Sequence, residues 1–304
     1  MNRIRPAYVI LEYGIGEGTE NPLGYVPSNQ FKDSSEHMSQ IAAVIKENAK
    51  FDFRIVSLPY SKAEEWLKEN RTDVFVLSAS VRGFLNSDFL RQFKDDFYMT
   101  CSVGNSASEG EGWNAQKDYF TGIGAVGEDR KLKSYSSYGK GVVDFVGVIK
   151  NGFISYTYQG KTHKKRLEGT SFSCPQHTAQ VMNLMVDYFN RFGEKPSLST
   201  ILTIRDRYTE DVLEPGRDLK SGLGIYTYGK SHLDGVKIKQ EEMLFDSLDE
   251  VPKWGKSTVE KLINRGALKG GGNGLNLSYQ MLRIYVTHDR MGLYDLGKNC
   301  CQKE

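Results

Sequence analysis

Apolar runs alternate with amphipathic segments along most of this chain, and the alternation limits the folds that it can adopt. The apolar runs are typical of buried parallel strands, and the amphipathic segments carry apolar residues at helical spacing. Together they predict an α/β fold in which helices flank a parallel sheet. The predicted strands lie at residues 7–13, 53–59, 73–80, 98–105, 118–129 and 142–149, and the predicted helices at 37–49, 61–70, 87–97 and 173–193. We expect His37 to open the first helix and Ser61 to cap the second.

The pattern changes after Tyr228, which indicates a second module. A polar stretch with the composition of a linker comes first, and two helical patterns around a glycine-rich turn follow it. We therefore expect a large domain at residues 1–230, a linker at 231–247 and a small helical hairpin at 248–304.

Charge and hydropathy exclude several classes of protein. The formal net charge is +2 over 304 residues, which is too close to neutral for a nucleic-acid surface. No apolar run is long enough to cross a bilayer, and Glu12 interrupts the run near the N-terminus. That run is typical of a first strand and not of a secretory signal. We therefore expect a cytoplasmic protein, or one released by lysis, with no nucleic-acid or membrane partner.

Cysteine and histidine give no support for a metal centre or a disulfide framework. The four cysteines are irregularly spaced, and two of them, Cys300 and Cys301, are adjacent. The five histidines include no His-Glu-x-x-His motif. The residues themselves therefore predict no metal and no cofactor, and a reducing compartment.

The stretch LEGTSFSCPQHTAQ, residues 167–180, contains the best candidate for a nucleophile. Ser171 lies at the mouth of the longest predicted helix, where free N–H groups and the helix dipole favour negative charge. A plain helix cap is the alternative for this serine. Serine is a poor nucleophile without a base in hydrogen-bond reach, so the rest of the chain decides between the two. We expect Cys174, in the same stretch, to be a packed residue.

Three polar residues at the edges of predicted elements can complete such a site. Glu12 ends the first strand, where a carboxylate is costly unless it is paired. His37 begins a helix, from which its ring can project into a cleft. Asn105 begins the glycine- and serine-rich loop after a strand that ends at Gly104, and its amide can donate to an oxyanion. Each of these residues also fits a plain turn or surface role.

These segments, in this order, resemble the motifs of subtilisin-like serine proteases. VILEYGIG is similar to the motif around the family's catalytic aspartate and HMSQIAAVI to its histidine motif. SVGNSASEG resembles the segment with the oxyanion asparagine, and GTSFSCP resembles the nucleophile motif. The resemblance runs from about Pro6 to about Tyr228 and implies a subtilisin-like parallel sheet flanked by helices.

The resemblance implies a serine endopeptidase that acts on a protein or peptide substrate. It makes Ser171 the nucleophile, His37 the base, Glu12 the acid that orients the base, and Asn105 the oxyanion donor. Calcium sites are common in the family, and calcium is implied on that ground alone.

A further segment, DVFVLSAS, resembles the strand that lines the substrate cleft of the family. Its last residues, Ser78, Ala79 and Ser80, stand where the family has a glycine pair. The resemblance implies that they bind the substrate by β-strand addition, since backbone groups make that interaction.

Two further departures from the family motifs concern the catalytic acid and the histidine. Glu12 stands in place of aspartate and is longer by one methylene, which is about 1.5 Å of reach. Asp33 and Glu36 are alternative acids, and Glu36 would point away from its neighbour His37 if a helix starts there. Met38 stands in place of glycine, and we expect it to narrow the cleft beside the histidine.

Two other functions fit the same sequence. The departures are compatible with a catalytically impaired binding protein that keeps the fold. The C-terminal segment resembles a single S-layer-homology-like repeat of Gram-positive bacterial or phage proteins, which favours a cell-wall-associated or phage-associated processing protein. The module would then bind cell-wall polymer, another partner or a second copy of the chain, and a plain packing appendage is the remaining alternative.

Overall fold

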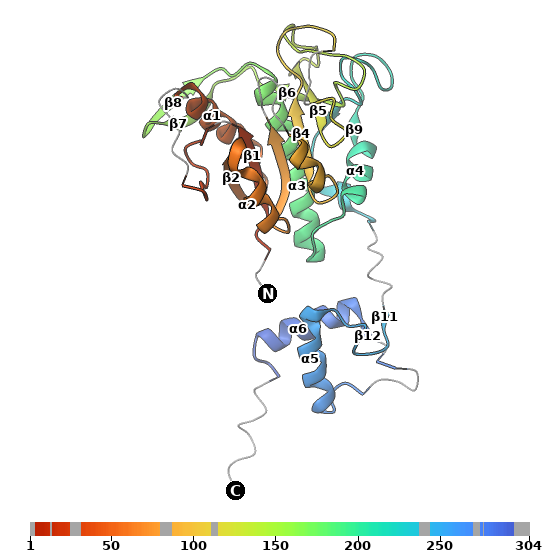
Figure 1. Ribbon diagram of the computed structural model, residues 1–304. Helices are drawn as coiled ribbons and strands as arrows, with labels where there is room; N and C mark the ends of the chain where they lie inside the picture. Colours follow the sequence, from red (N-terminus) through yellow and green to blue (C-terminus); the bar gives the residue numbers. More distant parts are fainter. Residues whose placement is uncertain are drawn as a thin grey trace. The chain divides into compact units, whose positions relative to one another are not determined.

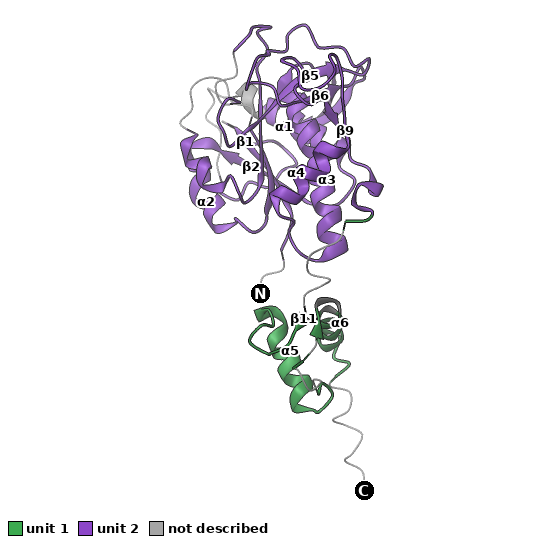
Figure 2. Ribbon diagram, turned by 90° about the vertical axis from the view of Figure 1, so that its right-hand side faces the viewer, with its two compact units in different colours: residues 1–2, 235–304 green, residues 3–234 purple. Residues whose placement is uncertain are grey.

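The computed structural model describes residues 4–12, 14–24, 32–79, 87–110, 115–236, 244–269, 274–275 and 277–294. The chain divides into two compact units, one of residues 3–234 and the other of residues 235–304 with 1–2 (Figure 2).

The larger unit is built on a six-stranded parallel sheet (Figure 1). The strand order is β2-β1-β3-β4-β5-β6, so β1 lies between β2 and β3. In this register Leu11 of β1 is opposite Leu58 on one side and Ala79 on the other. The predicted α/β fold with a parallel sheet is therefore confirmed. The strands are β1 (Ala7–Glu12), β2 (Arg54–Pro59), β3 (Val74–Ala79), β4 (Tyr98–Ser102), β5 (Thr121–Gly127) and β6 (Phe145–Ile149).

Helices cover both faces of this sheet, which explains why β1 is apolar from Ala7 to Leu11. Ala7, Val9 and Leu11 belong to the same buried cluster as Trp66 of α2 (Ala63–Glu69). Tyr8 points to the other face, where its hydroxyl donates to the carbonyl of Pro175 in α3 (Thr170–Phe192). Because side chains alternate along a strand, Glu12 falls on the same face as Tyr8, beside α3 and α1 (Lys32–Asn48).

Two helix starts differ from the sequence prediction. The helix α1 begins at Lys32 and not at His37, because serine and aspartate at its start hide the helix from an apolar periodicity that begins only at Met38. Ser61 does not cap α2, because it lies inside the short 3-10 helix η2 (Tyr60–Lys62) and the N-cap Lys62 makes no side-chain bond. The segment at 87–97 is helical only as the 3-10 helix η3 (Asp88–Phe93).

The region around α3 contains elements that the sequence did not predict. An antiparallel hairpin of β7 (Ile154–Tyr158) and β8 (Lys161–Lys165) turns at Gln159 and Gly160, which both have positive φ. The helix α4 (Leu198–Arg207) follows α3, and the short strands β9 (Thr209–Glu210) and β10 (Ile225–Tyr226) pair with each other. A 3-10 helix, η4 (Lys230–Leu233), ends this part of the chain.

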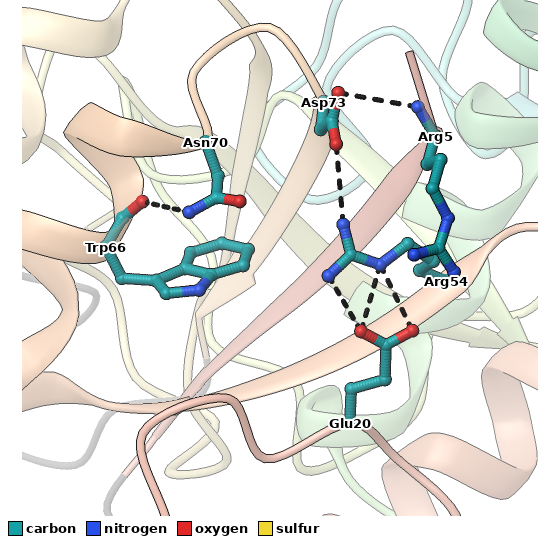
Figure 3. A network of polar contacts seen from close by, with 6 residues as sticks. All are labelled: Arg5, Glu20, Arg54, Trp66, Asn70 and Asp73. Atoms are coloured by element: carbon teal, nitrogen blue, oxygen red, sulfur yellow. Dashed lines mark hydrogen bonds and ion pairs between the residues drawn. The ribbon is translucent and has the colours of Figure 1, made fainter. Parts of the chain in front are cut away.

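A polar network fixes the segment that follows β1 against β2 (Figure 3). Arg54 reaches Glu20 at 2.7 Å and Asp73 at 3.5 Å, so its guanidinium joins the segment to two strands. The backbone of Glu20 extends the sheet beside Val56. Asn70 closes the end of α2 by donating to the carbonyl of Trp66 at 2.9 Å.

The smaller unit contains two helices, α5 (Lys253–Asn264) and α6 (Tyr279–Arg290), as the periodicity predicted. A pair of two-residue strands, β11 (Leu244–Phe245) and β12 (Leu277–Ser278), accompanies them. The two helices pack so closely that a Cβ at Gly255 would lie 2.7 Å from the side chain of Leu282. The unit has a buried cluster of its own, formed by Phe245, Val251, Val259, Leu277, Leu282 and Val286.

Candidate active site

Glu12 and His37 form an ion pair at the end of β1. Glu12 is only 4% exposed, and a buried carboxylate is stable only when it is paired. Its two oxygens both lie 3.1 Å from Nδ1 of His37. A carboxylate at Nδ1 fixes the orientation of an imidazole ring and leaves Nε2 to act as the base.

The ring of His37 is accessible. Its side chain is 30% exposed, and among the described residues none forms a hydrogen bond with Nε2. The ring meets Phe172 edge to face, with 5.3 Å between the ring centroids. This contact places His37 beside the residue that follows Ser171.

A close approach of two chain segments sets the position of His37. A Cβ at Gly16 would lie 2.7 Å from the carbonyl oxygen of Met38, so only glycine lets α1 lie this near to the segment after β1. The N–H of Glu17 donates to the Ser39 hydroxyl at 2.8 Å and adds a second tie. Met38 itself is 0% exposed. The expectation that Met38 narrows the cleft is therefore wrong, because its side chain packs in the core.

Ser171 lies in the first turn of α3 and is half-buried. The turn begins at Gly169, whose φ is +125°, and the N–H groups of Phe172 and Ser173 bond to the Gly169 carbonyl. The N–H of Ser171 has no acceptor within the helix, as is usual in a first turn, and is available to a ligand. No described residue forms a hydrogen bond with the Ser171 hydroxyl, and such bonds often tighten only when substrate binds.

Asn105 is held next to this turn with its amide nitrogen free to donate. Its oxygen Oδ1 accepts from the N–H of Thr170 at 2.8 Å and from the Thr170 hydroxyl at 3.0 Å. Both bonds use the oxygen, so Nδ2 points elsewhere and would lie 3.4 Å from a Cβ at Gly169. An amide donor beside a serine on a helix start is an arrangement that can stabilise an oxyanion.

The predicted substrate strand is only partly described. Ser78 and Ala79 are buried, and β1 and β4 flank them on both sides. Their backbone groups face neighbouring strands of the sheet, and substrate binding by Ser78 and Ala79 stays a prediction. Ser80 lies outside the described residues.

The alternative residues have other environments. Glu36 accepts hydrogen bonds from Tyr156 and Gln40, so it points away from its neighbour. The side chain of Asp33 lies outside the described part of the chain. Cys174 is 0% exposed, and burial raises the pKa of its thiol to about 12, so it is a packed residue and not a thiolate.

Tyr135 and Thr170 hold the site together, and the sequence analysis missed both. The N–H of Gly169 donates to the Tyr135 hydroxyl at 2.9 Å, and that hydroxyl donates to Glu168 at 3.0 Å. Burial raises the pKa of Tyr135 above its ordinary value, so the hydroxyl remains a neutral donor. In the sequence, only Thr170 could have been noticed, because it directly precedes Ser171. The contact of Tyr135 forms only in the folded chain and leaves no signal in the sequence.

Neither a metal centre nor a membrane span is found in the described part of the chain. No group of three or more His, Cys, Asp or Glu side chains there could hold a metal ion. None of the described helices is both long and apolar enough to cross a membrane.

Comparison with solved structures shows the fold to which this site belongs. No family model matches the sequence, and no curated protein matches it. A lanthipeptide protease is 15% identical, with a TM-score of 0.58 over 73% of this chain and 85% of that chain. The prenylagaramide maturation protease PagA is 17% identical, with a TM-score of 0.57 over 76% of this chain and 95% of that one. A mutant of the protease domain of PatA is 14% identical, with a TM-score of 0.56 over 76% and 96%. The chain therefore has a subtilisin-like fold, which it shares with these proteases.

Proposed function

We propose that the chain is a serine endopeptidase in which Ser171, His37 and Glu12 form the catalytic triad. The observation that carries the proposal is the buried Glu12 carboxylate at 3.1 Å from Nδ1 of His37. The side chain of His37 is 30% exposed and lies beside the first turn of α3, and Nε2 forms no hydrogen bond with a described residue. A carboxylate, an oriented imidazole and a serine on a helix start are the parts that acyl transfer needs.

The reaction then follows from the positions of these groups. Oγ of Ser171 attacks the peptide carbonyl while Nε2 of His37 takes its proton, and Glu12 stabilises the imidazolium. Nδ2 of Asn105 and the N–H of Ser171 stabilise the tetrahedral oxyanion. His37 gives the proton to the leaving amine, which leaves an acyl-enzyme. Water attacks the acyl-enzyme by the same route, and its proton returns to Ser171 through His37.

The glutamate is compatible with this mechanism. Its extra methylene supplies about 1.5 Å of reach, and the contact with both carboxylate oxygens shows that this length suits the position of α1. Glutamate orients histidine in other serine hydrolases.

We take a peptide as the substrate. One structure of similar fold is a lanthipeptide protease, whose name gives a peptide as its substrate, and another is a maturation protease for prenylagaramide. For this chain we infer cleavage of a peptide or precursor peptide.

Labelling with a fluorophosphonate probe tests the proposal. We expect the intact chain to be labelled at Ser171 and the Ser171→Ala variant to remain unlabelled. Ser173→Ala is the matched control, because the Ser173 hydroxyl is buried and bonded to the Thr170 carbonyl at 3.2 Å, and we expect it to keep its label. An intact chain without label would instead support a catalytically impaired binding protein.

A further inference from the structure

The hairpin of β7 and β8, which precedes Ser171 in the chain, concentrates positive charge. No aspartate or glutamate occurs between residues 145 and 166. The formal net charge of the whole chain is only +2, so charge is segregated here. The basic residues of this segment are Lys150, Lys161, Lys164, Lys165 and Arg166.

Most of this charge is not neutralised by neighbours. Lys150 pairs with Glu47 at 3.0 Å, and Arg166 approaches Glu168 at 3.7 Å. The lysines of β8 are exposed, and within the described residues they form no ion pair. These lysines are Lys161, Lys164 and Lys165, and we call them the β8 lysines.

The hairpin is held rigidly on the helix that carries His37. Tyr156 of β7 donates to Glu36 of α1 at 2.5 Å. At the hairpin turn, the N–H groups of Gln159 and Gly160 donate to the carboxylate of Glu17. The β8 lysines therefore have a fixed position relative to the Glu12–His37 pair, and binding a ligand there needs little ordering of the backbone.

A substrate in the active site can reach these lysines. Lys165 precedes Ser171 by six positions (171 minus 165), so their Cα atoms are at most about 22 Å apart. An extended peptide rises about 3.3 Å per residue, so roughly six substrate residues beyond the scissile bond span that distance. Among the described residues β8 pairs only with β7, which leaves backbone groups on its outer edge for an added strand.

We propose that β8 binds an acidic stretch of the peptide substrate, on the side of the scissile bond where α1 lies. Carboxylates of the peptide interact with the β8 lysines, and the open edge of β8 pairs with its backbone. This inference rests on the proposed function for its place in catalysis, but it defines a peptide-binding site that can be tested without cleavage. The competing explanation is that lysines on an edge strand only prevent aggregation.

Matched peptide pairs test the inference. Both peptides carry the same scissile site, and they differ in three glutamates or three glutamines at the fourth to sixth positions on one side of it. One pair is made for each side, and we expect the preference in one of the two pairs. We expect kcat/KM to favour the acidic peptide by about tenfold at low salt, since each exposed pair contributes about two- to fivefold. Because exposed charges are screened, we expect most of this preference to disappear in 0.5 M salt, since the Debye length falls from about 10 Å at 0.1 M toward about 3 Å at 1 M.

Charge reversal in β8 identifies the residues. We expect Lys164→Glu with Lys165→Glu to reverse the preference between the two peptides and to leave labelling of Ser171 unchanged. Lys94→Glu with Lys220→Glu is the matched control, because both lysines are exposed and the change in net charge is the same. An unchanged preference in the β8 double variant would overturn the inference and leave edge protection as the role of the lysines.

Binding to the Ser171→Ala variant separates this inference from the proposed function. We expect it to bind the acidic peptide about tenfold more tightly than the neutral one by fluorescence anisotropy, and the added β8 reversals to abolish that difference. If the intact chain is not labelled but this binding preference remains, the proposed function fails and the peptide site stands. Equal binding of both peptides, or β8-dependent binding of single-stranded RNA alone, would overturn the site.

Discussion

His37 and His177 lie on two helices that pack together, α1 and α3, but in opposite environments. His37 is 30% exposed at its side chain and has a carboxylate at Nδ1. His177 is 0% exposed and has no carboxylate among its hydrogen-bond partners.

The surroundings of His177 keep it neutral. Arg205 donates to the Tyr98 hydroxyl at 2.9 Å, and that hydroxyl lies 3.1 Å from Nε2 of His177. Among the described residues, the Nδ1 of His177 has no hydrogen-bond partner. Burial and the Arg205 charge lower the pKa of His177 well below 6.5.

The difference teaches what the fold requires of a base. A base must be able to hold a proton during the reaction, which needs a nearby negative charge and access for the substrate. His37 has both, and His177 has neither. Both residues lie near the start of a helix pattern in the sequence, so the environment distinguishes them and the residue type does not.

The largest expected effect comes from removing the Glu12 carboxylate, because His37 has this negative charge beside it and His177 has none. Glu12→Gln keeps the shape but removes the carboxylate that orients the ring, so we expect kcat/KM to fall by about 10⁴-fold. Glu12→Asp shortens the side chain by about 1.5 Å and weakens the contact at 3.1 Å, so we expect a loss of about 10- to 100-fold. Steady-state cleavage of a fluorogenic peptide measures both.

The matched variant on the other side of the comparison is His177→Gln. We expect its kcat/KM, per molecule labelled at Ser171, to stay within about threefold of the parent, because His177 is remote from solvent. If Glu12→Gln kept more than a tenth of the activity, Glu12 would not be the orienting acid.

The next effect concerns the cation that keeps His177 neutral. Arg205 is 5% exposed, and its guanidinium lies 4.1 Å from the centroid of the Phe145 ring. We expect Arg205→Ala to lower the free energy of unfolding by about 3 kcal/mol, because it removes this packing and the donor to Tyr98. Urea denaturation measures the change. Arg207→Ala is the control, and its exposed side chain should change stability by less than about 0.5 kcal/mol. Equal effects of the two substitutions would contradict a buried network.

The sheet could be predicted from the sequence because its strands are buried on both faces. A run such as residues 7–11 is apolar at every position, and helices between such runs leave few alternatives to a parallel sheet. The cost of a carboxylate in that strand also predicted that Glu12 has a partner, and the family resemblance implied His37.

Other features depended on contacts that no local pattern shows. The hairpin of β7 and β8 is mostly polar and exposed, so it lacks the alternation of a half-buried strand. The direction of Met38 depends on the close approach at Gly16, and the amide of Asn105 is oriented by Thr170 from a distant segment. Periodicity reports which side of an element is buried, and it does not report which residue of another element lies there.

A pH effect follows from the lowered pKa of His177. The unfolded chain binds a proton at this histidine below about 6.5, and the folded chain does not until a much lower pH. The contribution of His177 to stability is therefore complete above pH 6.5 and is lost as the pH falls below it, by up to about 1.4 kcal/mol per pH unit. Urea denaturation at several pH values between 7 and 5 measures the free energy of unfolding. We expect this free energy to fall less steeply with decreasing pH in His177→Gln than in the parent. Burial also lowers the pKa of His232, but this residue is present in both proteins, so its effect cancels when their pH dependences are compared. Identical slopes would mean that His177 has the same pKa in the folded and the unfolded chain.

The smallest effect tests whether the neighbours of His37 matter as those of His177 do. Tyr156 is 6% exposed and donates to Glu36 at 2.5 Å, and burial together with the Glu36 carboxylate raises its pKa, so it stays a donor. We expect Tyr156→Phe to lower the free energy of unfolding by about 1 kcal/mol, because Glu36 is partly solvated and regains water. We expect kcat/KM to fall by only about threefold, since the bond from Glu12 still holds the ring. A loss of more than about 30-fold, with stability unchanged, would show that the hairpin and not Glu12 sets the position of the base.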